Sequence, residues 1–228
     1  GRAEFVALVR ALGRRNKPSP VPDSQGALMV GGFNNWTRIR ELGTPIMPTT
    51  PKELYQDRFI LLSDGPYSAV PAADLGLGDR EWREISLAIR RDHECAHYFT
   101  RRLFGSMRNH AHDELMADWA GLVGATGRFR AEWFLRFLGL EDYPSYRPGG
   151  RLDLYRGDPP LSDEAFRLLH GVIRSAAFSL ESFDAPTETL EDRARMLTAL
   201  ASLRLDELAS PEGKTLLGRA LSAVDWRS

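Results

Sequence analysis

The sequence predicts a single domain of the α+β class, in which a small mixed sheet precedes a predominantly helical part. Two short apolar stretches in the first third are bounded by Gly, Pro, Asn or Asp, as strands commonly are. From Asp79 onward, apolar residues recur at helical spacing. A chain of 228 residues with 43% hydrophobic residues can also bury a core without disulfides. We therefore expect one domain over residues 1–228, with the sheet in 1–78 and the helical part in 79–228.

The N-terminal part is expected to begin with a helix and to contain two strands. Residues 1–13 have apolar side chains at helical spacing, and Gly13 is a suitable stop signal. Strands are expected over residues 27–33 and 58–70. The connection between them contains several prolines, which exclude a long helix there.

The rest of the chain is expected to be helical apart from one long loop. Asp79 and Glu81 are favourable at the start of the first of these helices, and Gly105 is favourable at its end. Residues 139–160 have the Gly, Pro and Tyr content of a loop. The expected helices cover residues 79–104, 107–126, 129–138, 161–182, 187–207 and 211–223.

Composition and charge exclude several classes of partner. The net charge of −1 gives no basic excess, so we expect no nucleic-acid partner. No apolar run approaches the length of a membrane span, so we expect no membrane partner either. The single cysteine, Cys95, rules out an internal disulfide and favours a reducing, cytoplasmic setting. Because the first residue is not methionine, the lack of a signal peptide says little about export. The sequence predicts no particular oligomeric state.

Two histidines, His93 and His97, stand four residues apart on the helix expected over 79–104. His93 follows the core-facing residue Ile89 by four positions, so both imidazoles project from or beside the buried face. An unpaired buried polar group costs roughly 1–3 kcal/mol, and a divalent metal is a partner that both rings can share. Glu94 lies one position round the helix, where it can accept a proton from a metal-bound water.

The next helix supplies a third ligand at a matching level. An HExxHxxGxxH pattern is excluded, because positions 100 and 103 hold Thr100 and Leu103. If Gly105 marks the turn between antiparallel helices, Glu114 lies level with His97, and Asp118 lies level with His93 and can orient it. The small residues expected to let the two helices pack closely are Ala117, Gly121, Gly124 and Ala125. His110 and His112 are alternatives to Glu114 as third ligand, although we expect both to be exposed.

His93-Glu94-Cys95-Ala96-His97 followed by Glu114-Leu115-Met116-Ala117-Asp118 resembles the HExxH…ExxxD signature of the gluzincin branch of zinc metallopeptidases. The resemblance covers residues 79–127. It implies a zincin-like fold with the HExxH helix at its centre. It also implies zinc held by His93, His97 and Glu114, with Glu94 as general base and Asp118 orienting His93.

The resemblance implies two further features. A downstream histidine or tyrosine commonly stabilises the oxyanion, and His170 is the first candidate, with Tyr143, Tyr146 and Tyr155 as alternatives. Zincin-like enzymes also pair an extended substrate with a sheet edge upstream of the metal helix. Residues 64–71 lie where that edge would be, either as the pairing edge or as a plain edge strand blunted by two prolines.

These features predict a zinc-dependent hydrolase that acts on a peptide or protein substrate. Its mechanism would use a metal-activated water with Glu94 as general base. The alternative is a non-catalytic binding or regulatory domain stabilised by metal, in which His110 or His112 completes a closed site of four protein ligands.

Overall fold

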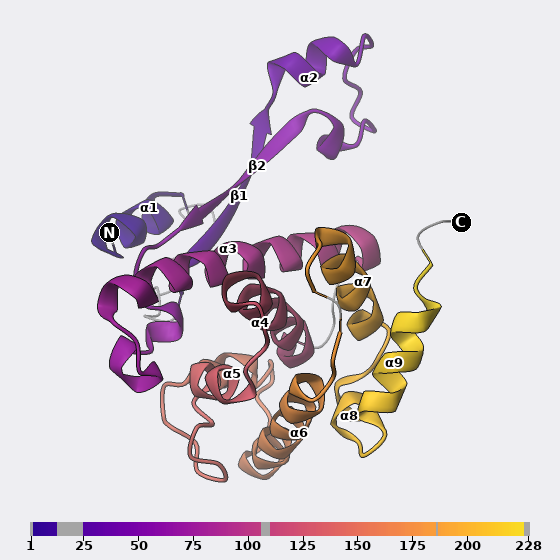
Figure 1. Ribbon diagram of the computed structural model, residues 1–228. Helices are drawn as coiled ribbons and strands as arrows, with labels where there is room; N and C mark the ends of the chain where they lie inside the picture. Colours follow the sequence, from indigo (N-terminus) through magenta and orange to yellow (C-terminus); the bar gives the residue numbers. More distant parts are fainter. Residues whose placement is uncertain (1, 13–24, 106–109, 186, 226–228) are drawn as a thin grey trace.

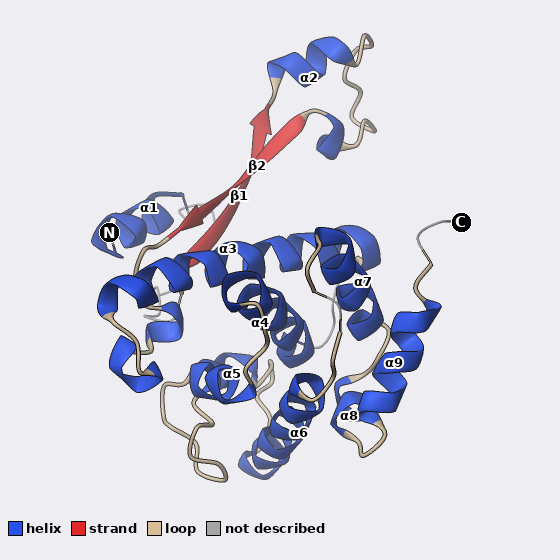
Figure 2. Cartoon of the chain, in the orientation of Figure 1, coloured by secondary structure: helices blue, strands red, loops and turns tan. Residues whose placement is uncertain are grey.

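A computed structural model describes residues 2–12, 25–105, 110–185 and 187–225 (Figure 1). The architecture is α+β: a helical body carries a two-stranded hairpin that projects away from it (Figures 1 and 2). The expected α+β class is therefore confirmed. No helix among the described residues has both the length and the apolar character needed to cross a membrane.

The sheet consists of β1 (Ala27–Asn34) and β2 (Gln56–Leu62). The strands are antiparallel, with Ala27 opposite Leu62 and a register shift between Gly31 and Phe33. The expectation of a mixed sheet is therefore wrong. Short helices α2 (Trp36–Glu41) and η2 (Lys52–Leu54) lie in the connection at the far end of the hairpin (Figure 1). The N-terminal helix α1 covers Arg2–Leu12, as expected.

The segment after β2 is not a strand, which corrects two expectations. The predicted strand over 58–70 ends at Leu62, and residues 64–71 form no sheet edge. Instead the chain forms two 3-10 turns, η3 (Tyr67–Ala69) and η4 (Ala72–Leu75), each preceded by a proline that breaks an extended ladder. Ser86 accepts a hydrogen bond from the Tyr67 backbone N–H at 3.0 Å, which ties this turn to the first long helix.

Most of the remaining helices were placed by the sequence within a few residues. The expectation of one helix over 187–207 is wrong. The chain there forms two shorter helices, Leu190–Ala201 and Leu205–Ala209, separated by residues 202–204. Buried leucines continue on both sides of the break, so the apolar spacing alone does not reveal it. The helices are α3 (Asp79–Phe104), α4 (His110–Thr126), α5 (Ala131–Leu138), η5 (Arg151–Tyr155), α6 (Asp163–Glu181), α7 (Leu190–Ala201), α8 (Leu205–Ala209) and α9 (Gly213–Ala223).

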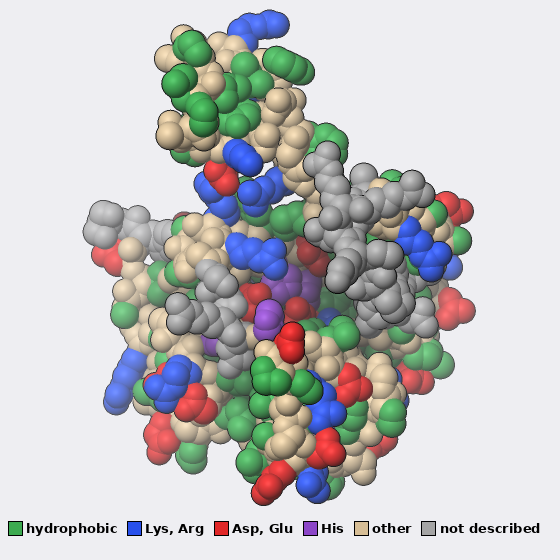
Figure 3. Space-filling view, turned by 180° about the vertical axis from the view of Figure 1, so that it is seen from behind, with side chains coloured by type: hydrophobic (Ala, Val, Ile, Leu, Met, Phe, Trp, Pro, Cys, Tyr) green, Lys and Arg blue, Asp and Glu red, His purple; other side chains and the backbone are tan. Residues whose placement is uncertain are grey.

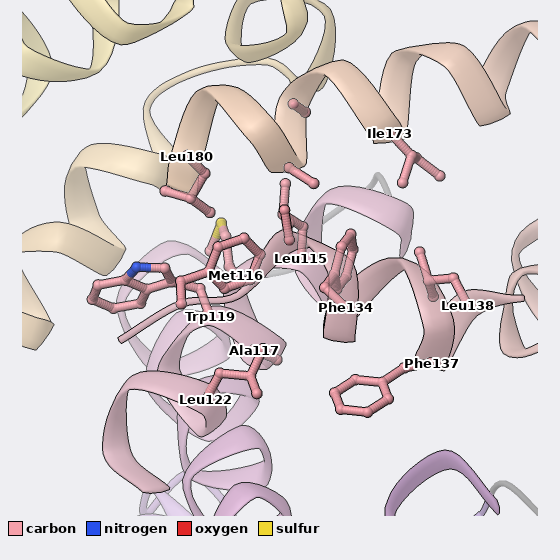
Figure 4. Packing of buried hydrophobic residues seen from close by; sticks show 14 of the residues in the cluster. Leu115, Met116, Ala117, Trp119, Leu122, Phe134, Phe137, Leu138, Ile173 and Leu180 are labelled. Carbon is pink, nitrogen blue, oxygen red and sulfur yellow. The ribbon is translucent and has the colours of Figure 1, made fainter. Parts of the chain in front are cut away.

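Helix α4 runs through the middle of the core. Figure 4 shows Leu115 and Met116 of α4 between Phe134 of α5 and Leu180 of α6. Helix α3 packs on its other side at very short range: a Cβ added to Gly121 would lie 2.7 Å from the carbonyl oxygen of Ile89. The expected close approach of α3 and α4 is thus confirmed, and it brings the polar residues of both helices together.

Candidate metal centre

Three side chains from α3 and α4 converge on one point. Nε2 of His93 lies 3.0 Å from Nε2 of His97. Glu114 lies 3.5 Å from each of these nitrogens, through Oε2 to His93 and through Oε1 to His97. The two histidines are buried and Glu114 is partly buried. His93, His97 and Glu114 therefore form a group that can hold a metal ion, as the matched spacing about Gly105 predicted.

A carboxylate lies close to the far nitrogen of each imidazole. Nδ1 of His93 lies 2.8 Å from Oδ1 of Asp118, and Nδ1 of His97 lies 3.0 Å from Oδ2 of Asp113. A carboxylate on Nδ1 favours the tautomer that donates there, which leaves the lone pair on Nε2. Asp118 thus occupies the orienting position expected for it.

This arrangement is electrostatically incomplete without a cation. Two Nε2 lone pairs and a carboxylate point at one another within 3.5 Å. In the absence of metal, a proton relieves the repulsion. Burial lowers the pKa of His97, but Asp113 and Glu114 outweigh it and raise the pKa from 6.5 to about 10. Burial raises the pKa of Glu114, but His97, His93 and Arg151 together shift it well below its ordinary value.

A buried network of hydrogen bonds supports His93 from behind. Tyr67 donates its hydroxyl to Asp118 at 2.5 Å, and the same oxygen lies 2.8 Å from Nδ1 of His93. Arg151, on η5, donates to the Tyr67 hydroxyl at 3.0 Å and to Oδ2 of Asp118. Although burial raises the pKa of Asp118, Arg151 and His93 hold it below its usual value, so the carboxylate stays charged. The network fixes the ring of His93 through three segments of the chain.

A cavity of about 230 Å³ opens beside the triad. Glu94 lines it together with His93 and Glu114, and it is half-buried. Tyr155, from the end of η5, lines the same cavity. Burial raises the pKa of the Tyr155 phenol well above its ordinary value, and the negative charges of Glu114 and Asp118 add to the rise while Arg151 opposes it, so the phenol keeps its proton.

The other candidates for the oxyanion group lie elsewhere. His170 is buried on α6, with its ring 4.5 Å from that of Phe166 and 5.3 Å from that of Tyr146, and it is not among the residues that line the cavity. Tyr146 donates to the carbonyl of Gly150. Tyr143 lies under the guanidinium of Arg174. Of the four candidates, the structure brings only Tyr155 to the cavity.

The two alternative third ligands also differ from expectation. His110 is exposed, as expected, whereas His112 is buried, and the expectation of exposure for it is wrong. Burial lowers the pKa of His112. Residue 112 lies two positions before Glu114 and so turns away from the ligand face of α4. Neither histidine belongs to the metal-binding group found among the described residues.

Three residues of the centre have no role in the expected motif. Asp113 carried a weak signal, since it is the acidic neighbour of Glu114. Tyr67 and Arg151 carried none, because each lies in an irregular segment far from the motif in sequence. Only the folding of these segments against α3 and α4 brings them to Asp118.

Comparisons with known proteins add a family but no activity. No curated protein and no solved structure shows a significant match to this chain. One family model does match, over residues 1–212, and its description is a family of unknown function. Because that match covers most of the chain, the protein belongs to the family DUF7005.

Proposed function

We propose that this protein is a zinc-dependent hydrolase that cleaves peptide bonds, with the zincin-like fold and gluzincin-type site that its motif resembles. The spacing of the three donor atoms carries the proposal. Zinc bonds of about 2.0–2.2 Å at tetrahedral angles place ligand atoms roughly 3.3–3.5 Å apart. The two separations of 3.5 Å match this spacing, and the 3.0 Å between the two Nε2 atoms is a few tenths of an ångström short of it, a difference that small rotations of the rings can supply.

When bound, zinc supplies a Lewis acid that polarises a carbonyl and lowers the pKa of water to about 7. Glu94 lines the cavity beside His93 without joining the ligand set, which suits a group that accepts a proton from the attacking water. Tyr155 keeps its phenolic proton and can donate a hydrogen bond to the oxyanion that develops on the substrate carbonyl. We therefore propose Tyr155 for this role in place of His170.

The number of ligands favours catalysis over a purely structural metal. A structural zinc site is usually closed by four protein ligands, whereas a catalytic one keeps a position open. Among the described residues the group has three members, and the cavity reaches it. The alternative of a metal-stabilised binding domain is supported less well, because His110 and His112 both lie outside the group.

The decisive experiment compares metal content and activity in two variants of the full chain. We expect Glu94→Gln to retain about one zinc per chain and to lose hydrolysis of a mixed peptide library. His97→Ala should lose the metal as well. A wild-type protein that binds zinc but cleaves no peptide in the library would instead support the binding domain.

A further inference from the structure

A second and larger cavity lies between the hairpin and α3. This hairpin groove has a volume of about 700 Å³. Its walls are Met29 and Gly31 of β1, Arg58 and Phe59 of β2, and Tyr98 and Arg101 of α3. The proposed hydrolytic mechanism uses none of these residues.

The hairpin groove lies next to the metal cavity along α3 and β1. Glu94, Tyr98 and Arg101 are spaced four and three residues apart, so they lie along one face of α3. Glu94 lines the metal cavity, and the other two line the groove. On β1, Ala27 lines the metal cavity and Met29 lines the groove. Their side chains point to the same side of the strand because they are two residues apart. The two cavities are therefore neighbours along both α3 and β1.

Positive charge dominates the groove. Four cations line it, Arg38, Lys52, Arg58 and Arg101, against two carboxylates, Glu53 and Asp57. Both carboxylates are already engaged: Asp57 lies 3.4 Å from Arg38, and Glu53 lies 3.3 Å from Arg58. Within the described ranges, Lys52 and Arg101 form no ion pair. Figure 3 shows Lys and Arg side chains where the hairpin meets the body, next to the histidines.

Arg58 is held so that it faces across the groove. Its side chain lies over Gly31, where an added Cβ would come within 3.3 Å of Cγ of Arg58. Its guanidinium lies 5.6 Å from the ring centre of Tyr98 on the opposite wall. Arg58 thus connects the hairpin to the face of α3 that carries Arg101.

We propose that the hairpin groove binds the substrate segment next to the cleaved bond and selects an acidic side chain there through Arg101 and Arg58. This inference rests on the proposed function and names its substrate class. From residue 94 to residue 101 a helix rises about 10 Å, and an extended chain advances about 3.3 Å per residue. The acidic residue therefore lies about three positions from the cleaved bond.

The test measures binding separately from cleavage. The zinc-loaded Glu94→Gln protein is titrated with a fluorescent peptide that has Glu three positions from a central bond, and with a matched peptide that has Gln there. We expect tighter binding of the acidic peptide, with an advantage that falls as salt rises. Adding Arg101→Glu should weaken binding of the acidic peptide about tenfold, because an exposed ion pair with the peptide is replaced by a repulsion. Binding of the Gln peptide should not change. Arg83→Glu, an exposed arginine on α3 outside the groove lining, is the matched control.

Equal binding of the two peptides, or an acidic preference that survives Arg101→Glu, would overturn the groove inference. Cleavage of a peptide library by the wild type without any acidic preference would overturn it too, while leaving the hydrolase proposal intact. Charge-dependent binding that Arg101→Glu abolishes would support the groove even if no peptide is cleaved. In that case only the hydrolase proposal fails.

Discussion

Oδ2 of Asp113 lies 3.0 Å from Nδ1 of His97, so the residue next to the candidate ligand Glu114 is placed to orient a second candidate ligand. Asp118, five residues later on α4, is placed in the same way against His93. One helix therefore provides a ligand and both carboxylates that set the imidazole tautomers. Thr100 donates to the other oxygen of Asp113 at 3.3 Å, which helps to hold the carboxylate in place.

Asp113→Asn should weaken zinc binding by roughly 10- to 100-fold, the usual effect of losing such an orienting group. The amide lacks the negative charge that increases the strength of His97 as an electron-pair donor to the metal. Competition with a chromophoric chelator measures the affinity. Asp74→Asn, on an exposed carboxylate near Arg136, is the control and should leave the affinity unchanged. Equal affinities in the two variants would contradict the role given to Asp113.

Arg151→Met should destabilise the fold by about 3–5 kcal/mol, because it leaves the buried carboxylate of Asp118 without its cation. Urea unfolding of the zinc-loaded protein measures the free energy. Arg204→Met breaks an exposed pair with Asp206 and should cost less than about 1 kcal/mol. If Arg151→Met costs no more than this control, the network is not a structural support for His93.

Zinc affinity should rise with pH, because His97 must lose a proton before it can bind the ion. In the metal-free protein its pKa is raised from 6.5 to about 10. The protonated ring therefore stabilises the metal-free fold fully below pH 6.5, and this contribution is lost as the pH rises through 10. Calorimetric titration with zinc at pH 8, in buffers of different ionisation enthalpy, should show a released proton. If the heat of zinc binding is the same in every buffer, no proton is released and the raised pKa of His97 is refuted.

Gly121→Ala should separate α3 from α4, because the new methyl group would lie 2.7 Å from the backbone oxygen of Ile89. We expect a loss of about 1–3 kcal/mol of stability and weaker zinc binding, since the ligands come from both helices. In Gly218→Ala the methyl group would meet only Phe183, at an ordinary 3.6 Å, and should be neutral or stabilising. Thermal unfolding and zinc titration of the pair separate a specific clash from a general effect of alanine.

Tyr155→Phe should reduce kcat by about 100-fold or more if its phenol supports the oxyanion. Zinc content should not change, because Tyr155 is not a ligand. His170→Phe is the comparison, and we expect it to affect stability rather than kcat, since the ring packs against Phe166 away from the cavity. A larger fall in kcat for His170→Phe would restore His170 as the oxyanion candidate.

The parts of the centre that depend on helical periodicity could be predicted from the amino-acid sequence. His93 and His97 share a face because they are four residues apart, and nearly equal distances from the turn place Glu114 and Asp118 opposite them. The bounds of α3 and β1 follow from equally local signals, whereas β2 covers only Gln56–Leu62 of the region around the strand expected over 58–70. Such features need only the geometry of one helix, or of two helices joined by a short turn.

The residues that surround the triad could not be predicted in this way, because they come from segments far from the motif. Tyr67 and Arg151 reach Asp118 because a proline-flanked turn and a long loop fold back onto α3 and α4, and no spacing in the sequence encodes that return. The same loop carries Tyr155 to the cavity, while α6 directs His170 into the aromatic cluster with Phe166 and Tyr146. Contacts of this kind depend on how whole segments pack to bury their apolar surface, which is a property of the complete chain.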